Sequence, residues 1–125
     1  MILGVGFDII EVERIRAAWK RHGERFARRI LREAEVAYCL AQADPVPSLA
    51  ARFAAKEAVS KAFGTGIGAE LGWQAIEIER LPSGQPQVRL HDDGARLLVE
   101  RGGRRVHLSL SHSAGHAAAV AILEN

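Results

Sequence analysis

The chain has 125 residues and a mass of 13.6 kDa, which predicts one domain, because a domain typically spans about 150 residues. Apolar residues make up 48% of the chain, charged residues 26%, and the net charge is +2, which excludes disordered, collagen-like and low-complexity chains. A single cysteine, Cys39, excludes an internal disulfide and a multi-cysteine zinc site. The N-terminus lacks a basic region and reaches Asp8 too early for a signal peptide or membrane span. We therefore expect a cytoplasmic protein with no membrane partner, whose domain covers residues 1–125.

The N-terminal half is predicted to contain one strand followed by helices. Residues 1–9 are typical of a strand, but Gly4 and Gly6 are poor strand formers and indicate that another backbone, a side chain or a ligand comes close there. Helices are predicted over residues 11–21, 24–40 and 49–63, with breaks at residues 22–23 and 42–47. We expect Ser48 to cap the last of these helices and Gly64 to end it.

The C-terminal half is predicted to contain mainly strands. They cover residues 73–81, 86–90, 104–111 and 116–123. Residues 82–84 form the turn of a hairpin, and Asp92 is expected to cap a short helix that ends at Arg101. The last strand is nearly all Ala, Val, Ile and Leu, which is typical of a strand buried on both faces. The pattern predicts an α+β fold in which a mostly antiparallel sheet packs with helices.

Three charged residues indicate phosphoryl chemistry. Asp8 lies between Phe7 and Ile9, where a carboxylate is costly to bury unless it has a partner, although it could also cap the following helix. Glu57 and Lys61 share one helix face, and the alternative is a surface pair worth about 0.2–0.5 kcal/mol. Two carboxylates, Asp8 and Glu57, suit Mg²⁺, which keeps waters and takes further ligands from substrate phosphates.

Other residues predict contacts to an anionic ligand. Arg52 and Lys56 lie on another side of the same helix among small residues, which leaves room for a bulky anion, unless both side chains simply extend to solvent. His112 follows a strand and could donate to a phosphate or be an ordinary turn residue. The glycines of residues 64–68 follow a helix, whereas those of a P-loop precede one. The three histidines near the C-terminus have spacings that do not converge on zinc.

A basic segment predicts a protein partner. Eight of the seventeen Lys and Arg residues lie between residues 14 and 32. In a continuous helix, five of them would lie within about 60° of one another: Arg14, Arg21, Arg25, Arg28 and Arg32. No aromatic residue shares this helix face with the arginines, because Trp19 and Phe26 would lie about a third of a turn away and pack inward, which disfavours single-stranded nucleic acid. An acidic protein surface is the favoured partner, and a solvated face or a nucleic-acid surface is the alternative.

Three motifs extend over almost the whole chain: GVGFDI at residues 4–9, RFAAKEAVSKAFGTGIG at residues 52–68, and SLSH at residues 109–112. With these motifs the chain resembles the holo-acyl-carrier-protein synthase family of 4′-phosphopantetheinyl transferases. The resemblance implies transfer of phosphopantetheine from coenzyme A to a serine of apo-acyl carrier protein, with release of adenosine 3′,5′-bisphosphate, in fatty acid biosynthesis. It also implies a Mg²⁺ cofactor and a homotrimer with an active site at each subunit interface.

The resemblance also implies residue roles. Asp8 and Glu57 would bind the metal, Glu57 or a water on the metal would take the serine proton, and Lys61 would neutralise the pyrophosphate or protonate the leaving phosphate. The coenzyme A contacts would be Arg52, Lys56, His112, Gly64 and Gly66. The carrier-protein contacts would be Arg14, Arg21, Arg25 and Arg29, to which the helical pattern adds Arg28. Gln85 stands where the family often has a lysine, so its turn offers no cation.

Two other functions remain open at this point. Another magnesium-dependent phosphotransferase or phosphohydrolase could use the same carboxylate pair. A nucleic-acid-binding module could use the basic segment, with Glu57 and Lys61 as a structural pair, and its affinity for duplex DNA would then fall steeply with salt and need no magnesium.

Overall fold

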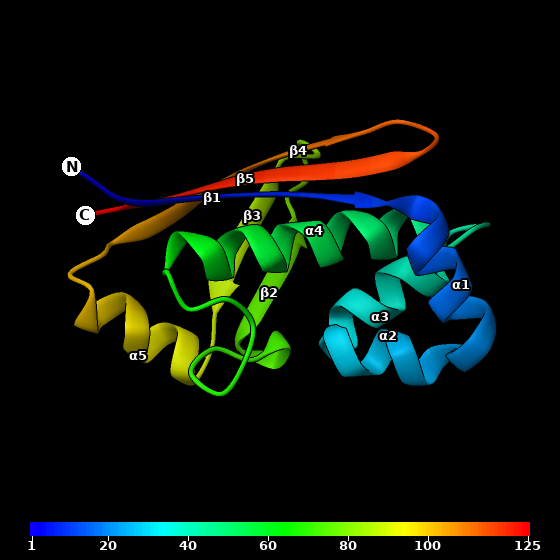
Figure 1. Cartoon of the computed structure of the whole chain (residues 1–125), viewed down its shortest axis with the longest axis horizontal. Helices are drawn as coiled ribbons and strands as arrows, with labels where there is room; N and C mark the ends of the chain where they lie inside the picture. Colours follow the sequence, from blue (N-terminus) through cyan, green and yellow to red (C-terminus); the bar gives the residue numbers. More distant parts are fainter.

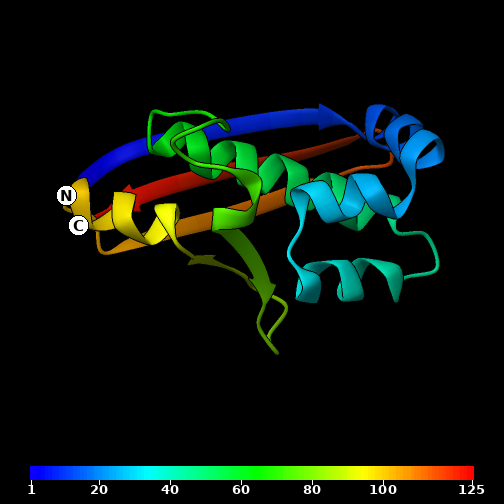
Figure 2. The same cartoon turned by 90° about the horizontal axis from the view of Figure 1, so that it is seen from below.

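The computed structural model describes all 125 residues and has an α+β architecture (Figure 1, Figure 2). Its elements are β1 Ile2–Glu11, α1 Val12–His22, α2 Glu24–Ile30, α3 Glu33–Leu40, α4 Val46–Ala62, the 3₁₀ turn η1 Trp73–Ala75, β2 Ile76–Arg80, β3 Pro86–Leu90, α5 Asp93–Glu100, β4 Arg105–His112 and β5 His116–Glu124. One antiparallel sheet has the order β1-β5-β4, and β2 pairs with β3 in a second. The predicted fold class is confirmed. No helix is both long and apolar enough to cross a membrane.

Helix α4 lies along the three-stranded sheet, with β1 and β5 above it in Figure 1. Gly4 and Gly6 explain how closely β1 approaches α4. A Cβ atom on Gly4 would overlap the carbonyl oxygen of Ala62, and one on Gly6 would overlap that of Ala58. The predicted close approach is therefore confirmed, and the approaching group is the backbone of α4. Because side chains alternate along a strand, Asp8 faces the same helix as these glycines.

Two helices start differently from the capping predictions. Helix α4 starts at Val46, whose backbone N–H donates to Asp44 Oδ1 at 3.1 Å, so Ser48 lies inside the helix and does not cap it. Helix α5 starts directly after Asp92, as expected, but the Asp92 side chain makes no capping hydrogen bond. The predicted end of α4 is confirmed, because Gly64 follows the helix with φ +80°.

The prediction of one helix over residues 24–40 is wrong. The backbone is extended at Leu31 and Arg32, which separate α2 from α3. Polar side chains take the backbone groups at this break. The Glu35 carboxylate accepts from the Arg32 N–H at 2.8 Å, and the Ile30 carbonyl accepts from Lys56 Nζ at 2.7 Å. The break is therefore stabilised by a carboxylate of α3 itself and by a lysine that is 26 residues from Ile30 in the chain.

Strand β5 is buried on one face, not on both as predicted. Its side chains alternate between buried positions that face α4 and half-buried positions on the other face. In β1, the residues that pair with this second face, Val5, Phe7 and Ile9, are each 57–58% exposed. An apolar sheet face is thus left uncovered. It consists of Val5, Phe7, Ile9, Ala118, Val120 and Ile122, and we call it the open sheet face.

Candidate active site

Asp8 and Lys61 form the centre of the candidate site. Lys61 Nζ donates to Asp8 Oδ1 at 2.9 Å and to the Phe7 carbonyl at 3.2 Å. The Lys61 side chain is 48% exposed and that of Asp8 is 15% exposed. The two residues meet because Gly4 and Gly6 let β1 lie directly against α4. An ammonium group therefore stands beside a carboxylate at a surface that a ligand can reach.

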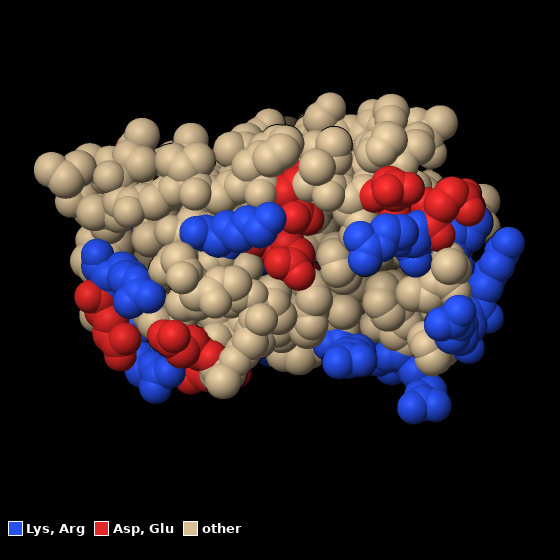
Figure 3. All heavy atoms as spheres, viewed as in Figure 1, with Lys and Arg blue, Asp and Glu red and all other residues tan.

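Glu57 lies one turn before Lys61 on α4 and is partly buried. Its side chain takes part in no hydrogen bond or ion pair. Partial burial raises the pKa of Glu57, the charge of Asp8 raises it further, and Lys61 opposes both effects. Figure 3 shows acidic and basic side chains next to each other near the middle of this face of the molecule. Glu57 is thus a carboxylate that repels its acidic neighbour and has no partner of its own.

The chemistry of this acidic pair fits a divalent cation. No three or more His, Cys, Asp or Glu side chains converge anywhere in the structure, so the protein offers at most an incomplete ligand shell. Mg²⁺ is commonly bound by one or two carboxylates plus substrate phosphates and water. A cation between Asp8 and Glu57 would also remove the repulsion that raises the pKa of Glu57. These two residues could therefore hold Mg²⁺ together with a phosphorylated substrate.

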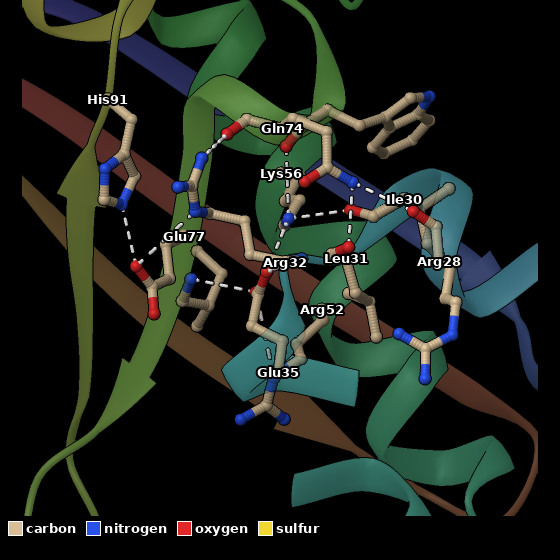
Figure 4. Close-up of polar contacts among 12 residues, drawn as sticks. Arg28, Ile30, Leu31, Arg32, Glu35, Arg52, Lys56, Gln74, Glu77 and His91 are labelled. Carbon is tan, nitrogen blue, oxygen red and sulfur yellow. Dashed lines mark hydrogen bonds and ion pairs between the residues drawn. The ribbon is translucent and has the colours of Figure 1, made fainter. Parts of the chain in front are cut away.

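Lys56 lies in the core, in contrast to the substrate-binding position expected for it. Its side chain is 0% exposed. Lys56 Nζ donates to the Ile30 carbonyl at 2.7 Å, to Glu35 Oε1 at 2.8 Å and to the Trp73 carbonyl at 3.1 Å (Figure 4). An ammonium has three donor hydrogens, so none is left for a ligand. The placement of Lys56 at a coenzyme A site is corrected to a structural role that ties α2, α3 and η1 to α4.

Sequence reasoning missed the rest of this buried polar network. Glu35 is 2% exposed and accepts from Lys56 and from the backbone N–H groups of Arg32 and Ile78. Glu77 is also buried, and its Oε1 lies 2.7 Å from His91 Nε2. Figure 4 shows these side chains converging between β2, α3 and α4. The only sequence signal was the position of Glu35 three residues after Arg32, since a carboxylate at this distance from a cap residue can stabilise a helix start.

Arg52 and His112 lie on the other side of α4. Both line a cavity of about 390 Å³ between the start of α4, the β2–β3 hairpin and the end of β4. The Arg52 guanidinium lies 4.4 Å from the centre of the Tyr38 ring. Figure 2 shows β1 along one side of α4 and the hairpin projecting from the other. One chain therefore does not bring Arg52 and His112 together with Asp8, Glu57 and Lys61.

Gly64 and Gly66 form the loop that follows α4. Both have positive φ, +80° and +66°, which glycine adopts without strain. The Gly64 N–H donates to the Lys61 carbonyl at 2.9 Å, which places the loop beside the candidate site. A Cβ atom on either glycine would meet open space. Their conformation requires glycine, and the space beside them is open to a ligand.

The basic segment does not form the continuous stripe that a single helix predicts. Gly23, with φ +59°, separates α1 from α2. Arg28 pairs with Glu33 at 2.7 Å and with Glu24 at 3.5 Å, and Arg32 donates to the Gln74 carbonyl. Four exposed arginines have no hydrogen bond or ion pair, and Figure 3 shows basic side chains gathered over this end of the molecule. These four, which we call the free arginines, are Arg14, Arg21, Arg25 and Arg29.

Comparisons with known proteins support the motifs. Residues 4–121 match the model of a family described as the 4′-phosphopantetheinyl transferase superfamily. A holo-acyl-carrier-protein synthase from Chlamydia trachomatis is 52% identical over 123 residues, 98% of this chain and 100% of that protein. The enzyme of the same name from Koribacter versatilis is 47% identical over 125 residues, with 100% of each chain covered.

Solved structures agree in fold over the same length. The crystal structure of the Neisseria meningitidis holo-acyl-carrier-protein synthase superimposes with a TM-score of 0.93 at 38% identity and covers 100% of both chains. The Helicobacter pylori enzyme, crystallised in complex with coenzyme A, has a TM-score of 0.85 at 33% identity and covers 96% of this chain and 99% of its own. Sequence and structure therefore point to the same family.

Proposed function

This chain belongs to the 4′-phosphopantetheinyl transferase superfamily and is a holo-acyl-carrier-protein synthase, and on that premise we propose how its residues carry out the reaction. Coenzyme A donates 4′-phosphopantetheine to a serine of apo-acyl carrier protein, and adenosine 3′,5′-bisphosphate leaves. The observation that carries this assignment is the unpartnered Glu57 carboxylate beside the Asp8–Lys61 pair.

The transfer makes one bond and breaks another. The serine oxygen bonds to the phosphorus that carries pantetheine, and the bond from this phosphorus to the bridging oxygen of the pyrophosphate breaks. Glu57, a carboxylate with no hydrogen-bond or ion-pair partner within the chain, takes the serine proton as general base. Lys61, half-exposed and fixed by Asp8 and the Phe7 carbonyl, neutralises charge that develops on the departing phosphate.

Asp8 and Glu57 are the residues that would hold Mg²⁺. When bound, the ion neutralises negative charge on the pyrophosphate oxygens, which is the main requirement of phosphoryl transfer. Asp8 has a second task in this proposal, because its contact with Lys61 fixes the ammonium against β1. Gly64 and Gly66 leave the space next to Lys61 open, so the backbone of this loop can lie close to the substrate phosphates.

We propose that the active unit is a homotrimer with a site at each subunit interface. Two features support an assembly. The open sheet face exposes Val5, Phe7 and Ile9 by more than half, which a neighbouring subunit would cover. The coenzyme A residues Arg52 and His112 lie across α4 from Glu57, and a neighbouring subunit could bring one group to the other. Each site would then combine residues of two chains.

The free arginines are the proposed docking surface for the carrier protein. They are exposed, lie on α1 and α2, and lack acidic partners within the chain, so their charge is available to an acidic protein surface. We further propose that residues 1–125 act as one transferase domain in the cytoplasm.

Intact-mass spectrometry of the carrier protein tests the proposed function. The protein is incubated with apo-acyl carrier protein, coenzyme A and Mg²⁺, with a chelator arm and a chelator-plus-excess-Mg²⁺ arm as controls. We expect a mass increase equal to one phosphopantetheine, lost with chelator and restored by Mg²⁺. Release of phosphate without a mass increase would instead indicate a phosphohydrolase, and no reaction with a folded enzyme would contradict the proposal.

A further inference from the structure

One side chain, Tyr38, links two arginines at the cavity that Arg52 and His112 line. The Tyr38 hydroxyl accepts from Arg80 Nη1 at 3.0 Å. Its ring lies under the Arg52 guanidinium, 4.4 Å from ring centre to the guanidinium carbon. Arg80 ends β2, Tyr38 belongs to α3 and Arg52 to α4, and all three line the same cavity of about 390 Å³. Tyr38 thus holds two cations from different elements on one wall.

Arg52 carries an unsatisfied donor at this cavity. Its side chain is 9% exposed, and its Nε is buried without a hydrogen-bond partner. The nearest carboxylate oxygen, Glu35 Oε2, lies 3.9 Å away, and that carboxylate already accepts from Lys56 and two backbone N–H groups. A buried donor without a partner is costly. A bound anion in the cavity would offset part of this cost by pairing with the guanidinium charge.

The charges of the lining favour an anion. Arg52, Arg80 and His112 supply donors, and Gln42 and Ser48 add polar groups. Glu79 is the one carboxylate of the lining, and it pairs with Arg89 at 3.1 Å. Gly84, at the hairpin turn with φ +90°, lies beside the Arg80 guanidinium, so residue 84 places no side chain over it. The cavity therefore presents two guanidinium groups and an imidazole with its only acid already neutralised.

We infer that Arg80 is a further substrate-binding residue and that Tyr38 positions Arg80 and Arg52 around a phosphate monoester in this cavity. The inference rests on the proposed function. Coenzyme A has a pyrophosphate, which must lie at the reacting groups Glu57 and Lys61, and one phosphate monoester, at the ribose 3′ position. The monoester is the phosphate left for a separate basic cavity, and paired guanidinium groups match its oxygens geometrically. Arg80 thus discriminates coenzyme A from 3′-dephospho-coenzyme A.

Binding of coenzyme A and of 3′-dephospho-coenzyme A, measured by calorimetry without carrier protein, tests this assignment. We expect Arg80→Gln to weaken coenzyme A binding about tenfold, since the lost contact is a charge-assisted hydrogen bond, and to leave dephospho-coenzyme A binding unchanged. The matched control is Arg96→Gln, which removes an exposed arginine of α5 whose partners, Asp93 and Glu100, do not line the cavity. This control should leave the affinity for coenzyme A and the affinity for 3′-dephospho-coenzyme A unchanged.

Two outcomes would overturn the assignment. Equal affinity of the wild-type protein and Arg80→Gln for coenzyme A would remove Arg80 from the site. Equal weakening for both ligands would show that Arg80 does not read the 3′-phosphate. Tyr38→Phe keeps the ring under Arg52 but removes the acceptor for Arg80, and it should show the same ligand selectivity with a smaller loss. An unchanged affinity in Tyr38→Phe would overturn its positioning role.

Steady-state kinetics separates this inference from the proposed function. In Arg80→Gln, the KM for coenzyme A should rise while kcat is retained, because the cavity lies away from Glu57 and Lys61. If the wild-type protein binds coenzyme A selectively through Arg80 but transfers nothing, the function fails and the subsite stands. If the wild-type protein and Arg80→Gln both transfer phosphopantetheine and prefer coenzyme A to 3′-dephospho-coenzyme A to the same extent, the subsite fails and the function stands.

Discussion

Two lysines of α4, five residues apart, have opposite environments. Lys56 is completely buried, and its ammonium donates to three oxygens of the protein. Lys61 is half-exposed, and its ammonium contacts one carboxylate and one carbonyl at the edge of β1. All three donor hydrogens of the Lys56 ammonium are paired, whereas the neighbour of Lys61, Glu57, has no partner at all. The side of α4 that faces β1 therefore holds the reacting groups, whereas Lys56, on the other side, stabilises the fold.

This contrast shows what distinguishes a functional charge from a structural one. Both lysines belong to the same motif and both pair with a carboxylate, so neither residue type nor spacing separates them. The difference lies in unused hydrogen-bonding capacity. Burial lowers the pKa of Lys56, and Glu35 opposes that shift, which keeps the pair as an internal tie. Partial burial and Asp8 raise the pKa of Glu57, which leaves it ready to accept a proton or a cation.

Removing the buried ammonium should have the largest effect on stability. We expect Lys56→Met to lower the free energy of unfolding by about 3–5 kcal/mol, because it leaves the Glu35 carboxylate buried without its partner. Urea unfolding followed by circular dichroism measures the change. The matched control is Lys61→Met, for which we expect a loss of less than about 1 kcal/mol, as for exposed ion pairs. Similar losses in both variants would break the comparison.

Removing the exposed ammonium should act on the reaction. We expect Lys61→Met to lower kcat about 100-fold, in line with loss of one preorganised charge at a reacting phosphate, while coenzyme A affinity changes little. Single-turnover transfer at saturating coenzyme A measures this effect. If Lys61→Met retains the wild-type kcat, Lys61 does not neutralise charge in the reaction, and its contact with Asp8 is its only role.

Charge reversal in the free arginines should affect recognition alone. We expect the double variant Arg14→Glu, Arg25→Glu to raise the apparent KM for the carrier protein about tenfold or more, with coenzyme A binding unchanged. Steady-state kinetics with varied carrier protein at two salt concentrations measures it, and the wild-type KM should rise with salt.

A pair of neighbouring residues sharpens this prediction. Arg29 has no partner, whereas Arg28 is paired with Glu24 and Glu33. Arg29→Gln should therefore raise the KM for carrier protein more than Arg28→Gln does. The reverse order would return the interaction surface to the stripe expected from a continuous helix.

The smallest expected effect is on the pH dependence of stability. The pKa of Glu57 is raised in the folded protein, so its ionisation costs folding energy as pH rises from its ordinary pKa through the raised one. Above that range, Glu57→Gln should melt at a slightly higher temperature than the wild type. Below about pH 4, where the carboxyl is protonated in both states, the difference should vanish. A lower melting temperature at neutral pH would show that Glu57 has a stabilising partner.

The sequence predicted the side of α4 that faces β1 better than its buried side. Gly4 and Gly6 indicated a close approach, and the approach of α4 explains how Asp8 reaches Lys61. Lys56 was misplaced because its three acceptors come from Ile30, Glu35 and Trp73, which are far from it in sequence. Local patterning contains no information about such partners.

Helix phase explains the other differences. The five-arginine stripe depended on a continuous helix, and the chain instead changes direction at Gly23 and again at Leu31. This change of phase gives the neighbours Arg28 and Arg29 different surroundings. The helical pattern therefore selected Arg28, which is paired with acidic residues, and not Arg29, which has no partner. The cavity residues Tyr38 and Arg80 belong to no motif, because two elements that are far apart in sequence, α3 and β2, bring them together.

The most direct test of a catalytic face on α4 is the rate of phosphopantetheine transfer by Glu57→Gln, followed by intact mass of the carrier protein at equal concentrations of folded enzyme. We predict a loss of about 1,000-fold, within the range for removal of a positioned base, with wild-type melting temperature or higher at neutral pH. Transfer within about tenfold of the wild-type rate would contradict the assignment of Glu57 and, with it, the division of α4 into a reactive and a structural side.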